Sequence, residues 1–520
     1  MKKLFISISF LSMMFSWFSC KNKEFKEYWP YGVNYEVFVL SFADGNGDGK
    51  GDLIGLTQRL DHLTDLGVGA VWLMPIMPSP SYHKYDVTDY KGIHPDYGTV
   101  DDFKKFVEEA HKRNIQVIID LILNHTGVDH PWFKEAVKGK DNPYRDYYYW
   151  ADIDSVADEI SKKEISLDSD NITQWHAVNG DTSAEHYYGF FYGGMPDLNF
   201  DNPKVKEEFI DIGKFWLEEM KVDGFRLDAA KHIFPTDRAT DNHAFWVWFR
   251  DEMQKIKPDV YLVGEVWSPA EEVAPYLKGL PALFNFDMGY AITSVVQAQS
   301  DTIHLVKKYK EIIDFYQTVT PNYIDATFLK NHDQNRILSE LENDEDKLRV
   351  AASILFTLPG TPYVYYGEEI GMKGMKPDEY IREPFLWDEG KKDVMQTTWE
   401  IPKYSTDKTV IPLKQQKRKS SSLYNFYKKW IAYRNESDVM TLGELTETPF
   451  TIKEVVTMIR SSGEQKLLAL HNVSDIEITV SLESIPEFKK IDFTTNKKAV
   501  LKEDTLILPA YSSVVLKNNE

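Results

Sequence analysis

The chain has 520 residues and carries 60 Lys and Arg against 81 Asp and Glu, a formal net charge of -21. Its 42% hydrophobic and 14% aromatic residues supply ample apolar surface for a large core and exclude intrinsic disorder. At roughly 150 residues per domain, this length predicts about two to four domains. The surplus of carboxylates argues against a nucleic-acid partner, because phosphate binding requires clustered Lys and Arg.

The first residues have the pattern of an export signal. Two lysines precede an apolar run over residues 4–18, which is shorter than the roughly 20 residues that a membrane-spanning helix needs. Cys20, the only cysteine, follows the run directly, an arrangement similar to the lipoprotein signals of bacteria, in which the cysteine is lipidated. We therefore expect residues 1–19 to be a signal peptide and Cys20 to be lipidated. Trp17-Phe18 departs from the usual small or aliphatic residues, and an ordinary signal peptide cleaved elsewhere is the alternative.

Residues 31–366 alternate short apolar runs with amphipathic stretches, a pattern typical of a parallel sheet covered by helices. Apolar residues at helical spacing mark helix faces around residues 56–63, 103–110 and 205–216. Eight strand–helix repeats predict a closed (β/α)8 TIM barrel, assigned to residues 28–125 and 200–435. The eight strand candidates are Val33–Val39, Ala70–Met74, Val117–Leu123, Gly224–Leu227, Val260–Val263, Leu283–Phe286, Thr327–Leu329 and Tyr363–Tyr366.

Two further segments depart from this alternation. Residues 126–199 separate the third and fourth strands, which is too long for one loop and helix, so we expect an inserted domain there. Residues 436–520 consist of short alternating runs separated by Gly, Ser and Asn. This pattern predicts a C-terminal antiparallel β-sandwich domain.

Polar and charged side chains follow four of the predicted strands. In a barrel of this kind reactive groups lie at the carboxyl ends of the strands, because the loops converge there on one mouth. A single Asp at a strand end is usually a helix cap or a salt bridge, but coincidences on four strands favour a catalytic site. The residues concerned are Asn124, His125, Arg226, Asp228, Glu265, Asn331, His332 and Asp333.

Paired carboxylates in an apolar-walled pocket suit the hydrolysis of a glycoside, in which one attacks or stabilises the sugar cation and another delivers a proton. A carboxylate beside Arg226 would stay ionised and suits the nucleophile. Glu265, flanked by apolar residues, is expected to have a raised pKa and to act as a general acid. Asp333 supplies the third charge, and a buried structural ion pair is the alternative for Glu265.

Four ordered segments resemble the motifs of the α-amylase family, glycoside hydrolase family thirteen, and the similarity covers about residue 31 to the C-terminus. The resemblance implies a retaining two-step mechanism with Asp228 as nucleophile, Glu265 as acid/base and Asp333 as transition-state stabiliser. It also implies that His125, Arg226 and His332 surround the reacting sugar and that Tyr85 stacks against it. The segments are Asp120-Leu-Ile-Leu-Asn-His125, Gly224-Phe-Arg-Leu-Asp-Ala-Ala-Lys-His232, Gly264-Glu-Val-Trp267 and Phe328-Leu-Lys-Asn-His-Asp333.

The segment Ser81-Tyr-His-Lys-Tyr85-Asp86 bears on bond specificity. Family members that cleave at chain ends commonly carry Asp where Tyr82 stands, paired with an Arg that closes the pocket. The segment resembles instead the Tyr-His-Gly-Tyr of endo-acting amylases, with Lys84 in place of Gly. Ala229 is similar to the residue found in α-1,4-specific members. By the same resemblance the expected substrate-binding residues are Tyr82, Tyr85, Asp86, His125, Arg226, Lys231, His232 and His332.

A glycine-rich loop over residues 44–52 has the character of a metal site. Oxygen-bearing side chains alternate with glycines that let the chain wrap around one hard cation, and calcium fits such a loop. The loop resembles the calcium loop after the first barrel strand in family relatives, and a solvated acidic turn is the alternative. A second calcium near Asn124 is a further expectation from the family. The candidate metal residues of the loop are Asp44, Asn46, Asp48, Lys50 and Asp52.

The resulting hypothesis is an exported endo-type α-1,4-glucan hydrolase that acts on starch, maltodextrin or a related α-glucan. It resembles the bacterial lipoprotein α-amylases, anchored through lipid to the outer membrane at the cell surface or its periplasmic face, with a starch-uptake assembly as partner. One rival is a different reaction in the same family, namely α-1,6 or neopullulanase-type cleavage or transglycosylation, because Met195-Pro-Asp-Leu-Asn199 lies between the motifs of these groups. The other rival is a non-catalytic glucan-binding protein, which would be expected to lack one of the three carboxylates.

Overall fold

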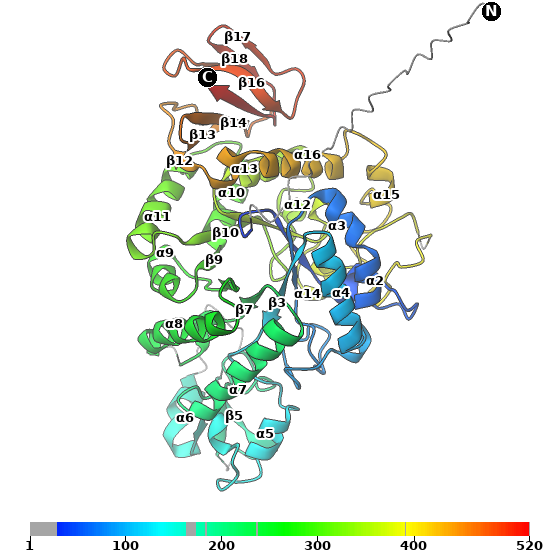
Figure 1. Ribbon diagram of the computed structural model, residues 1–520, viewed down its shortest axis with the longest axis vertical. Coiled ribbons are helices and arrows are strands. Elements are labelled where there is room, and N and C mark those ends of the chain that lie inside the picture. The colour runs from blue at the N-terminus through cyan, green and yellow to red at the C-terminus, as the bar shows by residue number, and fades with distance from the viewer. Residues whose placement is uncertain (1–28, 163–172, 183–184, 236–237, 391, 519–520) are drawn as a thin grey trace, which may run out of the picture.

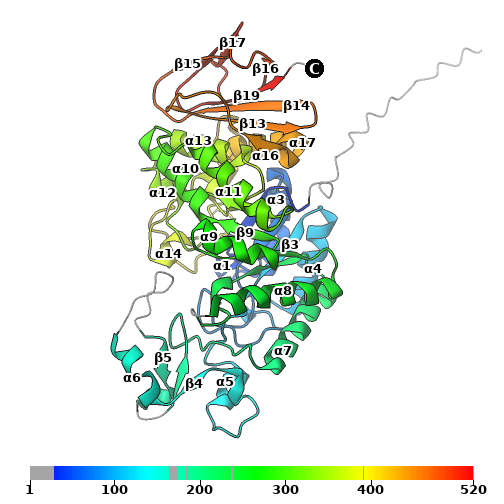
Figure 2. The ribbon, with the colours of Figure 1, turned by 90° about the vertical axis from the view of Figure 1, so that its left-hand side faces the viewer.

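The computed structural model describes residues 29–162, 173–182, 185–235, 238–390 and 392–518, so the predicted signal peptide and Cys20 lie outside the described residues. The C-terminal β domain lies at one end of the elongated molecule and the segment inserted after the third barrel strand at the other (Figure 1). A quarter turn shows the same order of the three parts (Figure 2). Within the described residues no helix combines the length and apolar character needed to cross a membrane.

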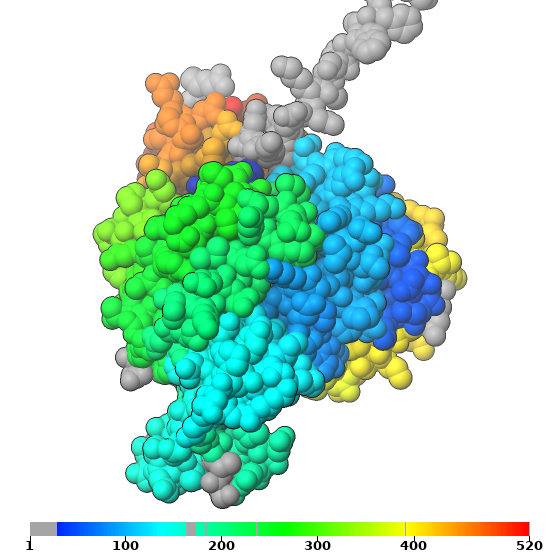
Figure 3. Space-filling view, turned by 60° about the horizontal axis from the view of Figure 1, so that its bottom comes forward, coloured from blue at the N-terminus to red at the C-terminus, as the bar shows by residue number. Residues whose placement is uncertain are grey.

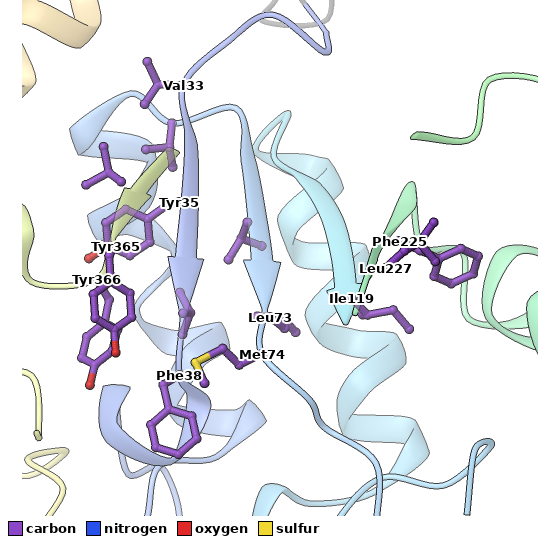
Figure 4. Packing of buried hydrophobic residues seen from close by; sticks show 14 of the residues in the cluster. Val33, Tyr35, Phe38, Leu73, Met74, Ile119, Phe225, Leu227, Tyr365 and Tyr366 are labelled. Carbon is purple, nitrogen blue, oxygen red and sulfur yellow. The ribbon is translucent and has the colours of Figure 1, made fainter. Parts of the chain in front are cut away.

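Eight parallel strands form a closed barrel in the order β1-β11-β10-β9-β8-β7-β3-β2. This confirms the predicted barrel, and the eight predicted strands are all present with ends displaced by a few residues. Figure 4 shows β1, β2 and β3 running in the same direction, with Phe38 just beyond β1 and Met74 just beyond β2. The barrel strands are β1 (Asn34–Val37), β2 (Ala70–Leu73), β3 (Gln116–Leu121), β7 (Gly224–Leu227), β8 (Tyr261–Gly264), β9 (Ala282–Asn285), β10 (Ile324–Phe328) and β11 (Thr361–Tyr365).

Helices surround the barrel and bury their apolar faces against its strands. The leucines around residues 56–63 predict one helix, whereas the structure has two, because the α-helical run is interrupted at Arg59. The helices associated with the barrel are α1 (Val39–Phe42), α2 (Leu53–Gln58), α3 (Leu60–Leu66), α4 (Val100–Lys112), α7 (Pro203–Lys214), α8 (Ala239–Ile256), α9 (Ala270–Val273), α10 (Phe286–Ala298), α11 (Leu305–Val319), α12 (Ile337–Glu340), α13 (Glu345–Thr357), α14 (Asp378–Ile381), α15 (Leu413–Gln416) and α16 (Leu423–Glu436).

The barrel interior is filled by side chains from alternate strand positions. Ala70 and Trp72 of β2 belong to this inner cluster, whereas Val71 and Leu73 pack into the larger cluster that includes the helices. The inner cluster also contains Tyr261, Phe284, Phe328 and Tyr363. The polar site at the mouth therefore rests on an apolar plug, in which a charge is poorly solvated.

The segment between β3 and β7 forms a small sheet of its own, with the order β4-β6-β5. It protrudes from the barrel as a separate lobe (Figure 3). Its elements are α5 (Pro131–Ala136), β4 (Trp150–Ala151), α6 (Ile153–Lys162), β5 (Trp175–Ala177) and β6 (His186–Tyr188).

The C-terminal domain has two antiparallel sheets that share one apolar core, which confirms the predicted antiparallel domain. The larger sheet has the order β12-β13-β14-β19-β16 and the smaller has the order β15-β18-β17. The elements are α17 (Asp438–Leu442), β12 (Glu444–Thr446), β13 (Val455–Ser462), β14 (Gln465–Asn472), β15 (Ile478–Ser481), β16 (Phe488–Thr494), β17 (Val500–Lys502), β18 (Thr505–Leu508) and β19 (Ser513–Asn518).

Two buried arginines, one from the barrel helix α16 and one from this domain, bind the end of α13 where the domain meets the barrel. Arg434 of α16 donates to the carbonyls of Phe356 and Leu358 at 2.8 Å, at the carboxyl end of α13. Arg460 of β13 donates to the neighbouring carbonyl of Thr357 at 2.7 Å. Because these carbonyls have no further turn of helix to accept from, the two guanidinium groups satisfy the helix end.

Candidate active site

The three predicted catalytic carboxylates lie together at the mouth of the barrel. Asp228 comes directly after β7 and Glu265 directly after β8, and Asp333 lies in the loop after β10. Their strands are neighbours or near neighbours in the barrel order, so residues distant in the sequence meet at one edge.

Arg226 connects the carboxylates from below. Its Nη1 lies 2.5 Å from Asp228 Oδ1 and 3.0 Å from Asp120 Oδ1, and its Nη2 lies 2.7 Å from Glu265 Oε2. The guanidinium is buried and stands 5.1 Å from the ring centre of Trp72 in the barrel interior. One cation thus bridges three acidic groups, which fixes their orientation and leaves the cluster with a surplus of negative charge.

Glu265 has the electrostatic environment of a general acid. Burial raises the pKa of Glu265 to about 7, with the charges of Asp228 and Asp333 adding to the rise and Arg226 opposing it. Burial also raises the pKa of Asp120, the carboxyl at the base of the cluster. A carboxyl with a pKa near 7 keeps its proton in a large share of the molecules up to neutral pH and can still release it to a leaving group.

His332 holds Asp333 in place and in its charged form. The Nε2 of His332 lies 3.0 Å from Asp333 Oδ2, and its Nδ1 lies 2.5 Å from Glu36 Oε1 of β1. Burial alone would lower the pKa of His332, but the two carboxylates raise it to about 10. Burial would raise the pKa of Asp333, yet His332 and Arg382 together hold it far below its usual range. Asp333 therefore stays an anion.

Tyr85 and His125 form the side of the site next to the inserted segment. The Tyr85 hydroxyl lies 2.6 Å from His332 Nε2, and the two rings stack with 5.7 Å between centres. His125 Nδ1 lies 2.9 Å from Asn124 Oδ1, whereas its buried Nε2 has no hydrogen-bond partner among the described residues. Burial lowers the pKa of His125 to about 4, so the ring is neutral and its free nitrogen is available to a sugar hydroxyl.

Tyr82 lies at the rim of the site and does not close it. Its ring stacks on Trp399 with 5.5 Å between centres, and its hydroxyl lies 3.5 Å from Nη1 of Arg382. Arg382 is bound instead by Asp333 at 3.0 Å and Asp378 at 2.8 Å. An arginine thus lies beside Tyr82, but position 82 supplies no carboxylate to pair with it.

Lys84 and Asp86 shape the loop that carries Tyr85. Lys84 has φ of 68°, the left-handed region that favours glycine, which accounts for the glycine at this place in the similar segment of endo-acting amylases. Its Nζ donates to the carbonyl of Ser81 at 2.8 Å. Asp86 is buried and accepts from the hydroxyls of Ser79 and Ser81, so within the described residues its contacts order the loop.

Lys231 and His232, which are predicted to bind substrate, follow Asp228 in the sequence by three and four residues. Lys231 Nζ donates to Ser268 Oγ at 2.9 Å, beyond Glu265. The His232 ring stacks on Phe190 of the inserted segment with 4.0 Å between centres. Both residues therefore lie between the barrel mouth and its neighbouring loops.

The predicted calcium loop wraps its side chains toward its own backbone. Asp44 accepts from the amides of Gly47 and Gly49 at 2.6 and 2.7 Å, and Asp52 caps α2 through the amide of Gly55 at 2.6 Å. Asn46 and Asp48 each accept from the amide two residues later. An ionised carboxylate has about four lone-pair sites, so each keeps capacity for a cation.

Lys50 and Asn124, the other candidate metal residues, are engaged in contacts with protein groups. The Lys50 side chain pairs with Asp96 at 2.9 Å, which leaves its carbonyl oxygen as the group able to bind a cation. Asn124, the residue of the predicted second calcium, is occupied by His125, Asp197 and the carbonyl of His232. Within the described ranges no three His, Cys, Asp or Glu side chains come together as a metal centre. The side-chain and carbonyl oxygens of the loop are nevertheless of the kind that a hard cation prefers.

Several residues of the site escape prediction from the sequence. Glu36 and Asp120 are acidic residues inside apolar strands, and this contrast is the signal that would have found them. Trp72 is hidden among the other core residues of β2. Arg382 and Trp399 come from irregular segments that carry no periodic pattern, so nothing in the sequence marks them.

A closed barrel with an acid of raised pKa, a second carboxylate on the same guanidinium and a third anion beside them defines a glycosidase centre. The chain matches the family "Alpha amylase, catalytic domain" over residues 36–443 and "Alpha-amylase SusG C-terminal domain" over residues 455–515. It therefore belongs to the α-amylase family of glycoside hydrolases and transglycosylases.

Individual relatives agree with this assignment. The chain is 41% identical over 517 residues to "Alpha-amylase 3" of Dictyoglomus thermophilum, covering 99% of this chain and 97% of the relative. It is 35% identical to the "4-alpha-glucanotransferase" of Thermotoga neapolitana, over 86% of this chain and 96% of the relative. The crystal structure of an α-amylase from H. orenii has a TM-score of 0.86 at 43% identity, covering 94% of this chain and 99% of that one.

Proposed function

We propose that the protein is a retaining, endo-acting α-1,4-glucan hydrolase for starch, maltodextrin or related α-glucans. The observation that carries the proposal is the bridge of Asp228 and Glu265 by one guanidinium. A single bridging group keeps the two carboxylates close, as a retaining enzyme requires, because the inverting arrangement leaves room for a water between them.

In the first step Asp228 attacks C1 of the sugar, the bond from C1 to the leaving oxygen breaks, and Glu265 gives that oxygen its proton. In the second step Glu265, now a carboxylate, takes a proton from water, whose oxygen attacks C1 and releases Asp228. The anion of Asp333 and the neutral nitrogen of His125 lie beside the cluster. They are placed to stabilise positive charge and to bind hydroxyls as the ring flattens.

The rim around Tyr82 supports cleavage within a chain. A glucan that continues past the site needs an open floor, and Tyr82 and Trp399 offer stacked aromatic rings there without a carboxylate to close the pocket. Ala229, directly after the nucleophile, leaves more room than the Val found in α-1,6-specific relatives. Both features favour α-1,4 bonds in a polymer over α-1,6 bonds at a chain end.

Transglycosylation is the second candidate reaction. It is supported by the relative from Thermotoga neapolitana, which carries the name of a glucanotransferase. Both reactions share the glycosyl-enzyme, and they differ only in whether water or a sugar hydroxyl attacks C1.

Time-resolved product analysis on amylose, pullulan and isomaltose tests the proposal. We expect rapid loss of amylose chain length before glucose or maltose accumulates, and little release from isomaltose. Maltotriose from pullulan, or glucose from isomaltose, as the dominant product would replace the α-1,4 assignment with an α-1,6 one. Longer oligosaccharides than the substrate supplied would place transfer ahead of hydrolysis.

We also propose that the loop of Asp44, Asn46, Asp48 and Asp52, with the carbonyl of Lys50, holds calcium. A bound cation would neutralise the carboxylates and hold the loop after β1, so its contribution is to stability. Calcium should raise the apparent melting temperature of the wild type. Asp48→Asn removes one carboxylate of the proposed site and should therefore remove most of that rise. Because Asp48 is exposed, the substitution leaves the core contacts of Asp44 and Asp52 intact.

Differential scanning calorimetry with and without calcium checks this expectation, with Asp259→Asn at an exposed position as the matched control. A wild-type transition that does not respond to calcium would contradict the proposal, and so would an equal rise in Asp48→Asn.

The proposed location is outside the cytoplasm, with Cys20 as lipid attachment at the outer membrane and a starch-uptake assembly as partner. It is supported by the signal pattern of residues 1–19.

A further inference from the structure

A groove of about 330 Å³ opens beside Asp333, outside the cluster of catalytic carboxylates. Trp267, Tyr290, Lys330 and Gln334 are among the residues that line it. Trp267 lies two residues after Glu265, and Asp333 forms part of the wall. The groove therefore begins on the side of the proton donor, where the leaving group departs.

The floor of the groove is aromatic. Trp267 stacks on Phe286 with 4.4 Å between ring centres and 12° between planes, and Tyr290 follows at 6.5 Å and 29°. Trp267 is 40% exposed and Tyr290 is 42% exposed, a degree unusual for large aromatic rings. Exposed rings in a row offer flat apolar faces of the kind on which the apolar faces of sugar rings stack.

Lys330 is the exceptional polar residue of this groove. It is only 5% exposed, and its Nζ stands 4.7 Å from the ring centre of Tyr290. No hydrogen bond or ion pair to this ammonium group exists among the described residues, whereas the nearby Lys376 is paired with Asp378 and Lys231 with Ser268. Burial lowers the pKa of Lys330, and the charge of Glu340, which also lines the groove, opposes this shift only in part.

Gln334 adds an unsatisfied acceptor to the same groove. Its buried Oε1 has no hydrogen-bond partner within the described part of the chain. Among the described residues neither the Lys330 ammonium nor the Gln334 oxygen has a hydrogen-bond partner, and the buried Gln334 oxygen costs free energy unless a ligand donates to it. A sugar hydroxyl both donates and accepts, so neighbouring hydroxyls of one ring match the pair. Asp333 and Glu340 also line the groove and would repel an anionic ligand.

We propose that Lys330 and Gln334 bind hydroxyls of the neutral glucan on the leaving-group side and thereby set the balance between transfer and hydrolysis. This inference rests on the proposed function. When the first leaving sugar has gone, a second sugar in the groove presents its hydroxyl to the glycosyl-enzyme. Its oxygen attacks C1, the bond from C1 to Asp228 breaks, and its proton passes to the Glu265 carboxylate. Water competes for the same C1, so a sugar held longer in the groove favours transfer.

The test uses an aryl α-maltotrioside as donor and maltose as acceptor. Aryl release reports formation of the glycosyl-enzyme, and the ratio of transfer product to free maltotriose reports its partition. This ratio does not depend on how much of the enzyme is active. In Lys330→Met, the maltose concentration for half-maximal transfer should rise about tenfold, the lower end of what a lost hydrogen bond to a charged group costs.

Three variants accompany Lys330→Met. Lys330→Arg keeps the charge and should recover most of the transfer, which a merely structural role would not produce. Gln334→Leu should shift the partition in the same direction and serves as a second probe if the first variant folds poorly. Lys307→Met changes an exposed lysine of α11 and should leave the ratio as in the wild type.

The outcomes distinguish failure of the proposed function from failure of this inference alone. A wild-type enzyme that releases no aryl group and cleaves no glucan would overturn the proposed function, and this inference with it. Activity on glucans with a partition ratio within about twofold of wild type in both Lys330→Met and Gln334→Leu would overturn the inference alone. A twofold change is smaller than the roughly fivefold effect of a typical neutral hydrogen bond.

Discussion

Asp228→Asn should lower kcat on maltooligosaccharides by about 10⁴-fold or more, because the amide cannot form the glycosyl-enzyme. The variant should still bind substrate, since His125, Tyr85 and the aromatic rim are unchanged. Removing the charge also removes one of the groups that raise the pKa of Glu265. Initial rates with a reducing-end assay, together with binding of maltoheptaose by calorimetry, check both expectations.

Asp259→Asn is the matched control for this variant. It makes the same chemical change at an exposed position before β8, at the end of the barrel remote from the mouth, and should keep wild-type rates. A rate for Asp228→Asn within about tenfold of wild type would contradict the nucleophile assignment, because loss of the nucleophile should lower the rate about 10⁴-fold or more. Loss of both rate and melting transition would indicate misfolding, and the comparison would then pass to Asp228→Glu, which keeps the charge and moves the oxygens.

Glu265→Gln should lower kcat on maltooligosaccharides by about 10³-fold, the middle of the range for general acid catalysis. Fluoride departs from α-maltotriosyl fluoride without protonation. Formation of the glycosyl-enzyme from this donor should therefore be much less affected by the substitution. Azide, which attacks without needing a base, should then speed turnover of the fluoride by the variant and give the α-glycosyl azide.

The pH profile of the wild type reports the same group. The pKa of Glu265 is raised to about 7 by burial, so the acid stays protonated below that pH and loses its proton above it. The rate on maltooligosaccharides should therefore fall about tenfold per unit as pH rises beyond about 7. With the fluoride donor this basic limb should be absent from the first step, and Glu271→Gln on exposed α9 should keep the wild-type profile. A basic limb that persists in Glu265→Gln would assign it to another residue.

Much of the fold follows from patterns that are local in the sequence. Each barrel strand is a short apolar run between amphipathic stretches, so its place can be read without knowing its neighbours. Helix limits were less predictable, as at Arg59, where two helices replace the single one implied by the leucine spacing. The spacing of Leu56, Leu60 and Leu63 reports which face is buried and does not report where the backbone bends.

The candidate site was also predictable from the sequence only in part. Asp228, Glu265 and Asp333 could be named because they stand directly after strands within ordered motifs. The pairing of His332 with Glu36 spans 296 residues and depends on the barrel closing between β1 and β11. Arg382 contacts Asp333 from an irregular segment, and the sequence of that segment has no periodic pattern that would have predicted the contact.

The sequence by itself determined the order of strands and helices, the identity of the three carboxylates and the oxygen-rich loop, because these depend on residue type and spacing along the chain. Only the tertiary structure decided the charge state of Glu265 and His332, the open rim at Tyr82 and the burial of Lys330 beside Tyr290. Each of these depends on burial and on neighbours from other strands. A pKa and a groove are properties of surroundings in space, and those surroundings exist only once the barrel has closed.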